Sequence, residues 1–355
     1  MNNDRIQEIL DLMEEARLDY FLISDPQSIA YCTGYYNDPH ERMFVFMISK
    51  HGNHTLFMND LFYLDHDLDV NIVWHKDGQD AIQTIVDEMH FPGRIGIDKN
   101  WASHFLLDLM KKLPDAKYIN ASPCVDLVRM KKDLQEQVLM IESSKINDAV
   151  MEEIIPFIQE GVTEKQLAKK LDELFFKHHS TCYGAIVAFG KNAADPHHEN
   201  DDTLLRKGDC VLIDMGCVYK GYCSDMTRTF FYEGILEEEI KVYEIVKKAN
   251  EAAEAMIKPG VKLLDIDKCA RKVISDEGYG KYFTHRLGHF IGRDVHEYGD
   301  VSSVNEMEVE EGMIFSIEPG IYLEGNFGVR VEDLVMVTKD GCQVLNSFTK
   351  DIYII

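Results

Sequence analysis

Two aspartates in the second half of the chain lie beside apolar runs that are typical of buried β-strands. Asp214 ends one such run and Asp225 precedes another. If a hairpin turns between Tyr219 and Lys220, the two aspartates are equally far from the turn and face each other across the strands. Buried carboxylates this close repel each other unless a cation or a shared proton lies between them, which favours a metal site. The alternative is a pair of exposed aspartates on a solvated sheet face.

A second candidate segment, residues 284–297, is rich in histidine and glycine. Its histidines are His285, His289 and His296, with glycines between them. Glycine permits close approach of the backbone to a site, and neutral imidazole is a good ligand for transition metals. A single histidine is more often structural, but three of them among glycines indicate a functional segment.

Two glutamates end strand-like apolar runs further along the chain. Glu318 lies in the run 315–320, and Glu332 in the run 328–333, where Arg330 shares its face by the period of two residues. Each feature alone is weak, because acidic residues at strand ends are common. Together with the aspartates and one histidine, they form a set of mostly hard oxygen donors, which suits two divalent metals better than one tetrahedral zinc.

Such a pair of metals predicts hydrolytic chemistry. Metal ions held by carboxylates can keep a hydroxide at neutral pH and can clamp an attacked carbonyl group. The four segments taken together are much more specific than any one of them. We therefore expect metal-assisted hydrolysis in the second half of the chain.

The elements that must position these residues divide the chain into two domains, 1–125 and 126–355, the second including a linker helix. The first domain reads as an α/β unit with strands and helices in alternation. Its expected helices are 5–18, 79–89 and 103–112, and its expected strands are 20–23, 43–48, 54–58, 71–74, 94–98 and 117–120. In the second domain, good helix formers dominate 124–158, a capping box at Thr163 begins another helix, and further helices are expected at 236–257 and 264–276.

Composition narrows the class of protein. A length of 355 residues, 45% of them hydrophobic, is enough for about two folded domains. A formal charge of −25 argues against nucleic acid or an anionic membrane as partner. The eight cysteines form no CxxC pair, so we expect reduced thiols and a cytoplasmic protein. Cys210, Cys217 and Cys223 cluster in the sequence, but their neighbours favour small strand residues and not ligands.

The motifs resemble those of the M24 metallopeptidases of the pita-bread fold. This family includes Xaa-Pro dipeptidases (prolidases), aminopeptidase P and methionine aminopeptidase. The matching segments are Asp214-Met215-Gly216, Ser224-Asp225-Met226-Thr227-Arg228-Thr229, His285-Arg286-Leu287-Gly288-His289, Ser316-Ile317-Glu318-Pro319-Gly320 and Val329-Arg330-Val331-Glu332-Asp333. The first 125 residues resemble the creatinase/prolidase N-terminal domain, which favours the prolidase and aminopeptidase P branch. The resemblance implies an α/β (α+β) architecture with these two domains.

By motif position, the resemblance also implies the metal ligands. They are Asp214, Asp225, His289, Glu318 and Glu332. The resemblance places Asp225 and Glu332 as bridges or near-bridges between two divalent ions, Asp214 on one ion, and His289 with Glu318 on the other. Manganese is the first expectation, and cobalt, zinc and iron remain alternatives because oxygen-rich sites accept all of them.

Further positions match residues on the substrate side of the family's site. His197 follows Pro196 and His296 stands in Asp-Val-His-Glu, and both match histidines that face the substrate; His198 is the alternative if the register shifts by one. Glu318 would orient a metal-bridging hydroxide or accept its proton. Arg330 matches an arginine that supports the site and contacts the substrate side.

One position departs from the family pattern. Several prolidases carry an arginine after the His-Glu pair that holds the substrate's carboxylate, whereas here Asp300 lies near that position and no arginine occurs between Arg293 and Arg330. A negative charge would repel a free carboxylate. Asp300 is therefore a candidate substrate-side residue that would favour longer peptides or a substrate with a positive group. A loop shift that brings in Arg293, or a residue of a partner subunit, is the alternative.

The leading hypothesis is a dinuclear-metal peptidase that cleaves Xaa-Pro bonds in dipeptides or short peptides. Proline suits such a site because its ring fixes φ and its imide carries no N–H. The alternatives are an Xaa-Pro aminopeptidase for longer peptides, a non-peptide hydrolase or lyase on the same fold, and a binding protein without activity. The family commonly dimerises with help from the N-terminal domain, so we expect a homodimer.

Overall fold

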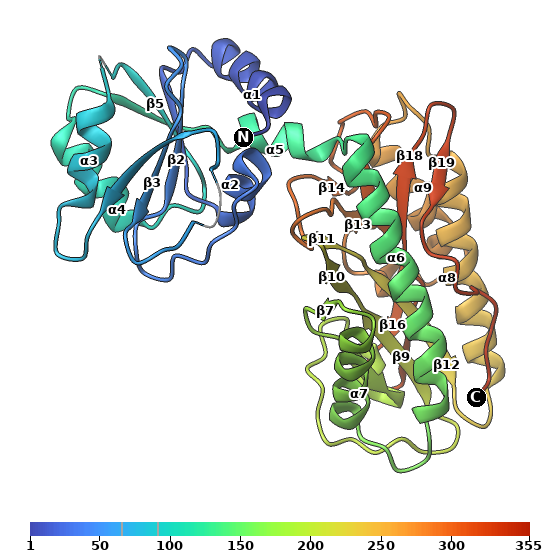
Figure 1. Cartoon of the computed structure of the whole chain (residues 1–355). Coiled ribbons are helices and arrows are strands. Elements are labelled where there is room, and N and C mark those ends of the chain that lie inside the picture. The colour runs from blue at the N-terminus through green and yellow to red at the C-terminus, as the bar shows by residue number, and fades with distance from the viewer. Residues whose placement is uncertain (65–66, 91) are drawn as a thin grey trace. The chain divides into compact units, whose positions relative to one another are not determined.

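The computed structural model describes residues 1–64, 67–90 and 92–355, and the chain separates into two units, Met1–Arg129 and Met130–Ile355 (Figure 1). The first unit combines helices with one mixed sheet, and the second combines long helices with short antiparallel strands. The expected α/β (α+β) class is therefore confirmed for the described residues.

The first unit is built on a six-stranded sheet with the order β4-β3-β2-β1-β5-β6. Its strands are β1 (Tyr20–Ile23), β2 (Val45–Ser49), β3 (Thr55–Asn59), β4 (Asn71–His75), β5 (Arg94–Ile97) and β6 (Lys117–Asn120). Strand β2 pairs antiparallel with both of its neighbours, and the other pairs are parallel. Because successive side chains point to opposite faces, strands such as β1 and β2 supply both faces of the sheet with apolar residues.

Helices cover both faces of this sheet (Figure 1). On one face, α1 (Asn3–Glu15), α2 (Pro26–Thr33) and α5 (Ser122–Met130) pack against Phe21 and Ile23. On the other face, α3 (Ala81–Glu88) and α4 (Ser103–Lys112) pack against Tyr20 and Leu22. The alternation along β1 thus divides the core into two layers.

The short helix α2 was not expected from the sequence. All residues from Ser28 to Thr33 are buried, so no polar face marks a helical period. Its end signals were nevertheless readable: Asp25 accepts a hydrogen bond from the Ser28 N–H, Pro26 stands at the first position, and Gly34 ends the helix with φ at +80°.

The second unit contains four helices and five small antiparallel sheets within residues 130–355, all of which are described. The helices are α6 (Leu134–Ile154), α7 (Glu164–Lys177), α8 (Glu237–Met256) and α9 (Leu263–Asp276). The strands after α7 are β7 (Thr181–Cys182), β8 (Ile186–Phe189), β9 (Cys210–Met215), β10 (Cys217–Tyr219), β11 (Tyr222–Cys223) and β12 (Met226–Phe231). The strands after α9 are β13 (Gly288–His289), β14 (Asp300–Val301), β15 (Ile314–Ile317), β16 (Gly320–Leu323), β17 (Phe327–Arg330), β18 (Asp333–Val337) and β19 (Cys342–Val344). The order of two helices followed by antiparallel strands therefore occurs twice.

The hairpin that carries the two aspartates turns one residue later than the sequence predicted. Lys220 and Gly221 form the turn with φ at +49° and +83°, which is the conformation that a two-residue type I′ hairpin requires. Asp214 consequently pairs with Thr227 and not with Asp225. The prediction that the aspartates lie directly opposite is wrong, but the shift of two positions leaves Asp225 diagonal to Asp214 on the same face.

The helix expected over 124–158 is two helices. Asp133 caps α6 in a reciprocal capping box with Glu136, so the chain leaves helical geometry between α5 and α6. The clustered Cys210, Cys217 and Cys223 are buried, free residues of β9, β10 and β11, as their neighbours indicated.

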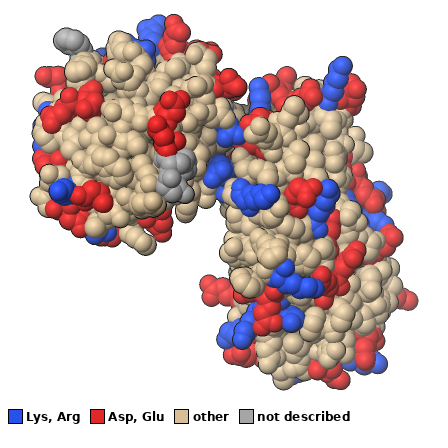
Figure 2. All heavy atoms as spheres, in the orientation of Figure 1, with Lys and Arg blue, Asp and Glu red and all other residues tan. Residues whose placement is uncertain are grey.

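The surface fits the composition. On the face shown in Figure 2, Asp and Glu side chains are spread over both units with Lys and Arg side chains between them. This pattern is typical of a solvated surface and shows no basic patch on that face for a polyanion. None of the described helices combines the length and the apolar character that crossing a bilayer demands.

Candidate active site

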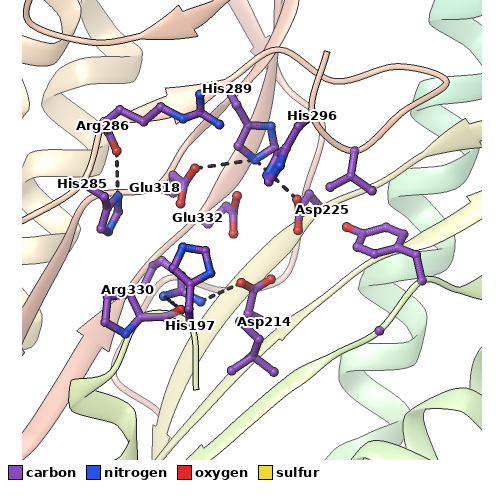
Figure 3. A pocket seen from close by; sticks show the side chains of 15 residues that line it. His197, Asp214, Asp225, His285, Arg286, His289, His296, Glu318, Arg330 and Glu332 are labelled. Carbon is purple, nitrogen blue, oxygen red and sulfur yellow. Dashed lines mark hydrogen bonds and ion pairs between the residues drawn. The ribbon is translucent and has the colours of Figure 1, made fainter. Parts of the chain in front are cut away.

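A cavity of about 350 Å³ in the second unit collects the residues that the sequence singled out (Figure 3). Those that line it are Asp214, Asp225, His289, Glu318, Glu332, His197, His296 and Arg330. They come from β9, the β11–β12 junction, β13, β17, and the loops that follow η2 (Gly190–Ala194), β13, β15 and β17. The cavity is thus assembled from segments on both sides of helices α8 and α9 in the sequence.

The centre of the cavity is formed by three buried side chains. One ligand atom each of Asp225, His289 and Glu332 lies within 4.8 Å of the other two. The Nε2 atom of His289 is 3.7 Å from Asp225 Oδ2 and 3.6 Å from Glu318 Oε1. Donors around an ion at about 2.1 Å stand about 3.0–3.5 Å apart, so these separations are close to those of a coordination shell.

The tautomer of His289 also suits a metal ligand. Its Nδ1 lies 3.2 Å from the carbonyl oxygen of Phe290, which can only accept, so Nδ1 carries the proton. Burial first, and then the neighbouring His296, lower the pKa of His289 to about 3. The imidazole is therefore neutral at pH 7 and its Nε2 lone pair faces the carboxylates, which is the arrangement of a metal-binding histidine.

Burial and mutual repulsion raise the pKa values of Asp225, Glu318 and Glu332 in the cavity. Burial first, and then the charges of Asp214 and Glu318, raise the pKa of Asp225 well above its usual range. Burial and Asp225 do the same for Glu332. Burial raises the pKa of Glu318 to about 7, with Arg330 acting in the opposite direction and Asp214 in the same one. A cluster with these shifts takes up protons or cations, so its donor chemistry fits divalent metal ions.

Backbone contacts bring His289 and Glu318 together. A Cβ on Gly288 would collide with the backbone oxygen of Ser316, so only glycine allows this approach. The Ser316 hydroxyl accepts the His289 N–H at 3.0 Å and donates to Glu318 Oε1 at 3.2 Å. The hydroxyl thereby ties the two proposed ligands to one position.

Glu332 is held from two sides. The Thr227 hydroxyl donates to Glu332 Oε2 at 2.6 Å and accepts from Arg330 Nε at 3.0 Å. Arg228, which is 1% exposed, donates to the backbone oxygen of Glu332 and to Asp333 Oδ1, each at 2.7 Å. The carboxylate of Glu332 is thus oriented by β12 before any ligand binds.

The guanidinium of Arg330 is bonded to other side chains of the protein. Its guanidinium is 3% exposed and donates to Asp214 Oδ2 at 2.6 Å and to the Tyr322 hydroxyl at 3.0 Å. Asp214 is the more accessible partner, with 22% of its side chain exposed. These contacts indicate that Arg330 orients Asp214, although it also lines the cavity.

His197 lines the cavity, whereas its neighbour His198 points elsewhere. The Nε2 of His198 is 2.7 Å from Glu164 Oε2 at the start of α7. Glu164 is fully buried and also accepts from the Phe189 N–H, the Asn192 amide and the Asp201 N–H. Although Glu164, His198 and Asp201 approach closely enough for a metal, donors already occupy both Glu164 oxygens, so this cluster fixes the His197 loop.

Replacement of His198 by alanine is expected to lower the free energy of unfolding by about 1–3 kcal/mol, because a buried acceptor loses a donor. The loosened loop should also lower kcat/KM, since His197 is its neighbour in the chain. Urea denaturation and steady-state kinetics measure the two effects. His198→Gln, whose amide can donate to Glu164, should restore much of both. Equal unfolding free energies for wild type and His198→Ala would contradict the role of this contact.

His296 packs against His289, the candidate metal ligand. Its ring centroid is 4.2 Å from that of His289, with the rings nearly perpendicular. The next residue, Glu297, pairs with buried Lys132 at 2.8 Å and accepts the Arg293 N–H at 2.9 Å. These contacts hold the loop that presents His296 to the cavity.

Asp300 does not line the cavity, in contrast to its expected place on the substrate side. It pairs with His289 through the backbone of β14, and its Oδ1 accepts the Ser302 hydroxyl at 2.8 Å. Arg293 is not on the cavity wall either. The strand pairing of β14 turns the Asp300 carboxylate toward its own loop, which the sequence did not reveal.

Some residues at the cavity were not assigned from the sequence. Tyr183 lines the cavity and donates its hydroxyl to the Ser224 carbonyl at 2.8 Å. Tyr322 lies behind the wall, with its hydroxyl 2.8 Å from Nε2 of the wall residue His285. Burial raises the pKa of Tyr322 to about 12. Arg286 is the remaining charged wall residue, and it stood inside the matched His285–His289 motif. The tyrosines carried no readable signal, because they reach the site only through folding.

Comparison with known proteins agrees with this geometry. Residues 138–339 match the model of metallopeptidase family M24, and residues 5–131 match the creatinase/prolidase N-terminal domain. An uncharacterized peptidase of Staphylococcus aureus (strain bovine RF122 / ET3-1) is 34% identical, with 98% of this chain and 99% of the relative covered.

Solved structures resemble the whole chain. The dipeptidase from Pyrococcus horikoshii OT3 has a TM-score of 0.92 and 35% identity, covering 99% of this chain and 100% of the other. The recombinant prolidase from Thermococcus sibiricus has a TM-score of 0.94 and 32% identity, covering 100% and 99%. The expected family and pita-bread fold are thereby confirmed. The family model matches more than half of the chain, the N-terminal domain matches as well, and the cavity carries candidate metal ligands. The chain therefore belongs to metallopeptidase family M24.

Proposed function

We propose that the protein is a dinuclear-metal peptidase that hydrolyses Xaa-Pro bonds in dipeptides or short peptides. The observation that carries the proposal is the convergence of four carboxylates and one neutral imidazole on one cavity. The proposed ligands are Asp214, Asp225, His289, Glu318 and Glu332. Manganese fits this oxygen-rich set best, and cobalt, zinc and iron are the alternatives.

Bound metal ions would supply Lewis acidity and a water molecule of lowered pKa. The chain's own residues provide the remaining steps. Glu318 lines the cavity 3.6 Å from His289 Nε2 and can orient the attacking water or take a proton from it. His197 and His296 face the cavity and can donate hydrogen bonds to the attacked carbonyl oxygen as its negative charge grows.

The substrate class rests on the relatives. The solved neighbours named above are a prolidase and a dipeptidase, and both cover nearly the whole chain. An Xaa-Pro aminopeptidase for longer peptides is the second candidate. It is favoured by the absence of any Lys or Arg from residues 294–329, which leaves that stretch without a basic side chain for a free carboxylate.

A peptide panel tests the proposal. The protein is stripped with EDTA, reloaded with Mn²⁺, and assayed with Leu-Pro, Leu-Pro-Gly, Leu-Ala and Leu-Ala-Gly. We expect cleavage of the prolyl peptides, with Leu-Pro preferred, and no turnover before metal is restored. Preferred cleavage of Leu-Pro-Gly would establish the aminopeptidase alternative, and preferred cleavage of Leu-Ala would exclude prolyl specificity.

We further propose a cytoplasmic homodimer, in which residues 1–125 serve assembly or access to the site. The free cysteines support a reducing compartment, since none of the eight is paired. Light scattering coupled to gel filtration should give twice the chain mass of 40.8 kDa. A mass of one chain at micromolar concentration would rule out the dimer.

A further inference from the structure

Two cations line the cavity among the described residues, and they differ in what they bind. Arg330 is buried and already bonded to Asp214, Tyr322 and Thr227. Arg286 is exposed, and its guanidinium makes no ion pair or hydrogen bond with any described residue. Within the described part of the wall, Arg286 is therefore the cation that remains available to a ligand.

The position of Arg286 is set by the histidine segment. Its backbone oxygen accepts a hydrogen bond from His285 Nδ1 at 2.7 Å, and Leu287 beside it is fully buried. In Figure 3 the side chain runs along the edge of the cavity toward His289, above Glu318. Its charge is, after burial, the next cause that lowers the pKa of His296. The guanidinium thus lies close to the groups that would act on a substrate.

The chemistry of this cation selects its ligand. A guanidinium presents a planar fork of donors that matches a carboxylate in a bidentate contact. In a dipeptide, the terminal carboxylate follows the scissile carbonyl by one residue, a spacing of about 3.8 Å between Cα atoms. No Lys or Arg occurs in residues 294–329, so that stretch offers a carboxylate no such cation, and the Asp300 carboxylate is bonded to Ser302.

We propose that Arg286 binds the free C-terminal carboxylate of the substrate and so selects peptides that end one residue after the scissile bond. The inference rests on the proposed peptidase function and deepens it, because it assigns the preference for dipeptides to one side chain. Arg286 touches the substrate away from the reacting carbonyl, and its contribution appears in binding.

The test compares acid and amide forms of one peptide. Wild-type protein loaded with Mn²⁺ is expected to prefer Leu-Pro over Leu-Pro-NH₂ by about 10- to 100-fold in kcat/KM, chiefly through KM. Arg286→Gln should lose that preference, because the substitution should raise KM for Leu-Pro and leave KM for Leu-Pro-NH₂ unchanged. Arg286→Lys should fall between the two, since it keeps the charge but not the fork. Arg206→Gln removes the same charge from an exposed loop outside the cavity and should behave as wild type.

The outcomes separate this inference from the proposed function. Equal losses on acid and amide, or an unchanged preference in Arg286→Gln with full metal content, would overturn the role of Arg286. If Leu-Ala is cleaved and Leu-Pro is not, prolyl specificity fails and the same comparison runs on Leu-Ala and Leu-Ala-NH₂. If no peptide is cleaved, the peptidase proposal fails. Calorimetric binding of Leu-Pro and Leu-Pro-NH₂ to the Mn²⁺-loaded proteins then decides: tighter binding of the acid to wild type alone supports the inference, and equal binding refutes it.

Discussion

Replacement of Asp225 by asparagine should lower turnover by about 10³-fold or more. Asp225 lies at the centre of the cavity with His289 and Glu332, and its carboxylate would hold metal ions there. An amide offers one neutral oxygen in place of two charged ones, so at least one ion should be lost. Loss of a Lewis acid worth several kcal/mol in the transition state corresponds to that fall in rate. Steady-state kinetics and metal analysis of the purified variant measure the two effects.

The same substitution should leave the metal-free protein at least as stable as wild type. Burial and the charges of Asp214 and Glu318 raise the pKa of Asp225 well above its usual range, so its ionised form is disfavoured there. Thermal unfolding in EDTA should therefore show an unchanged or higher Tm for Asp225→Asn. Addition of Mn²⁺ should raise Tm in wild type and much less in the variant.

Asp300→Asn is the matched control. Its carboxylate lies outside the cavity and accepts a hydrogen bond from Ser302, which an amide oxygen can also do. Turnover should stay within about threefold of wild type, as for most substitutions away from a site. Wild-type turnover in Asp225→Asn, or a large loss in Asp300→Asn, would show that the site has been placed wrongly.

Arg330→Lys is expected to lower kcat by about 10²-fold with little change in KM. Arg330 reaches Asp214, Tyr322 and Thr227 at once, and a lysine ammonium cannot reproduce that fork. Asp214 then loses its orientation. Mutation of a residue that orients a metal ligand typically lowers metal affinity or activity by 10- to 100-fold. Kinetics with Leu-Pro, together with Mn²⁺ titration, separate an effect on the ligand from an effect on substrate binding.

A buried arginine of the first unit provides the control for this change. Arg129 is 5% exposed and lies 3.3 Å from Asp25, outside the cavity. Arg129→Lys should reduce the free energy of unfolding by about 1–3 kcal/mol and leave kcat unaltered. A rise in KM with unchanged kcat for Arg330→Lys would instead assign Arg330 to the substrate.

Local patterns predicted the elements of the first unit well. Tyr20–Ile23, Ser103–Lys112 and Lys117–Asn120 have the same bounds in the sequence prediction and in the structure. In each of them the signal is the spacing or the type of a few neighbouring residues, so it does not depend on distant parts of the chain. Helix α2 escaped because only its caps, Asp25 and Gly34, distinguish it from a loop.

The register of the hairpin and the direction in which a side chain points were harder to predict. The hairpin turns at Lys220-Gly221, and this depends on which two residues adopt positive φ. Likewise, only one of two adjacent histidines, His197, lines the cavity, because Glu164 of α7 binds the other. Both outcomes depend on contacts between segments that are distant in the chain.

The sequence alone determined the residue types of the site and the kind of chemistry that they support. Four carboxylates and one imidazole are a hard donor set wherever they converge, and motif position identified Asp225, His289 and Glu332 among them. Only the tertiary structure decided which neighbouring side chains remain open to a ligand. Arg330 is already bonded to Asp214, Asp300 is bonded to Ser302 outside the cavity, and Arg286 is left exposed. The physical reason is that coordination chemistry is a property of each side chain, whereas availability depends on every group that packs around it.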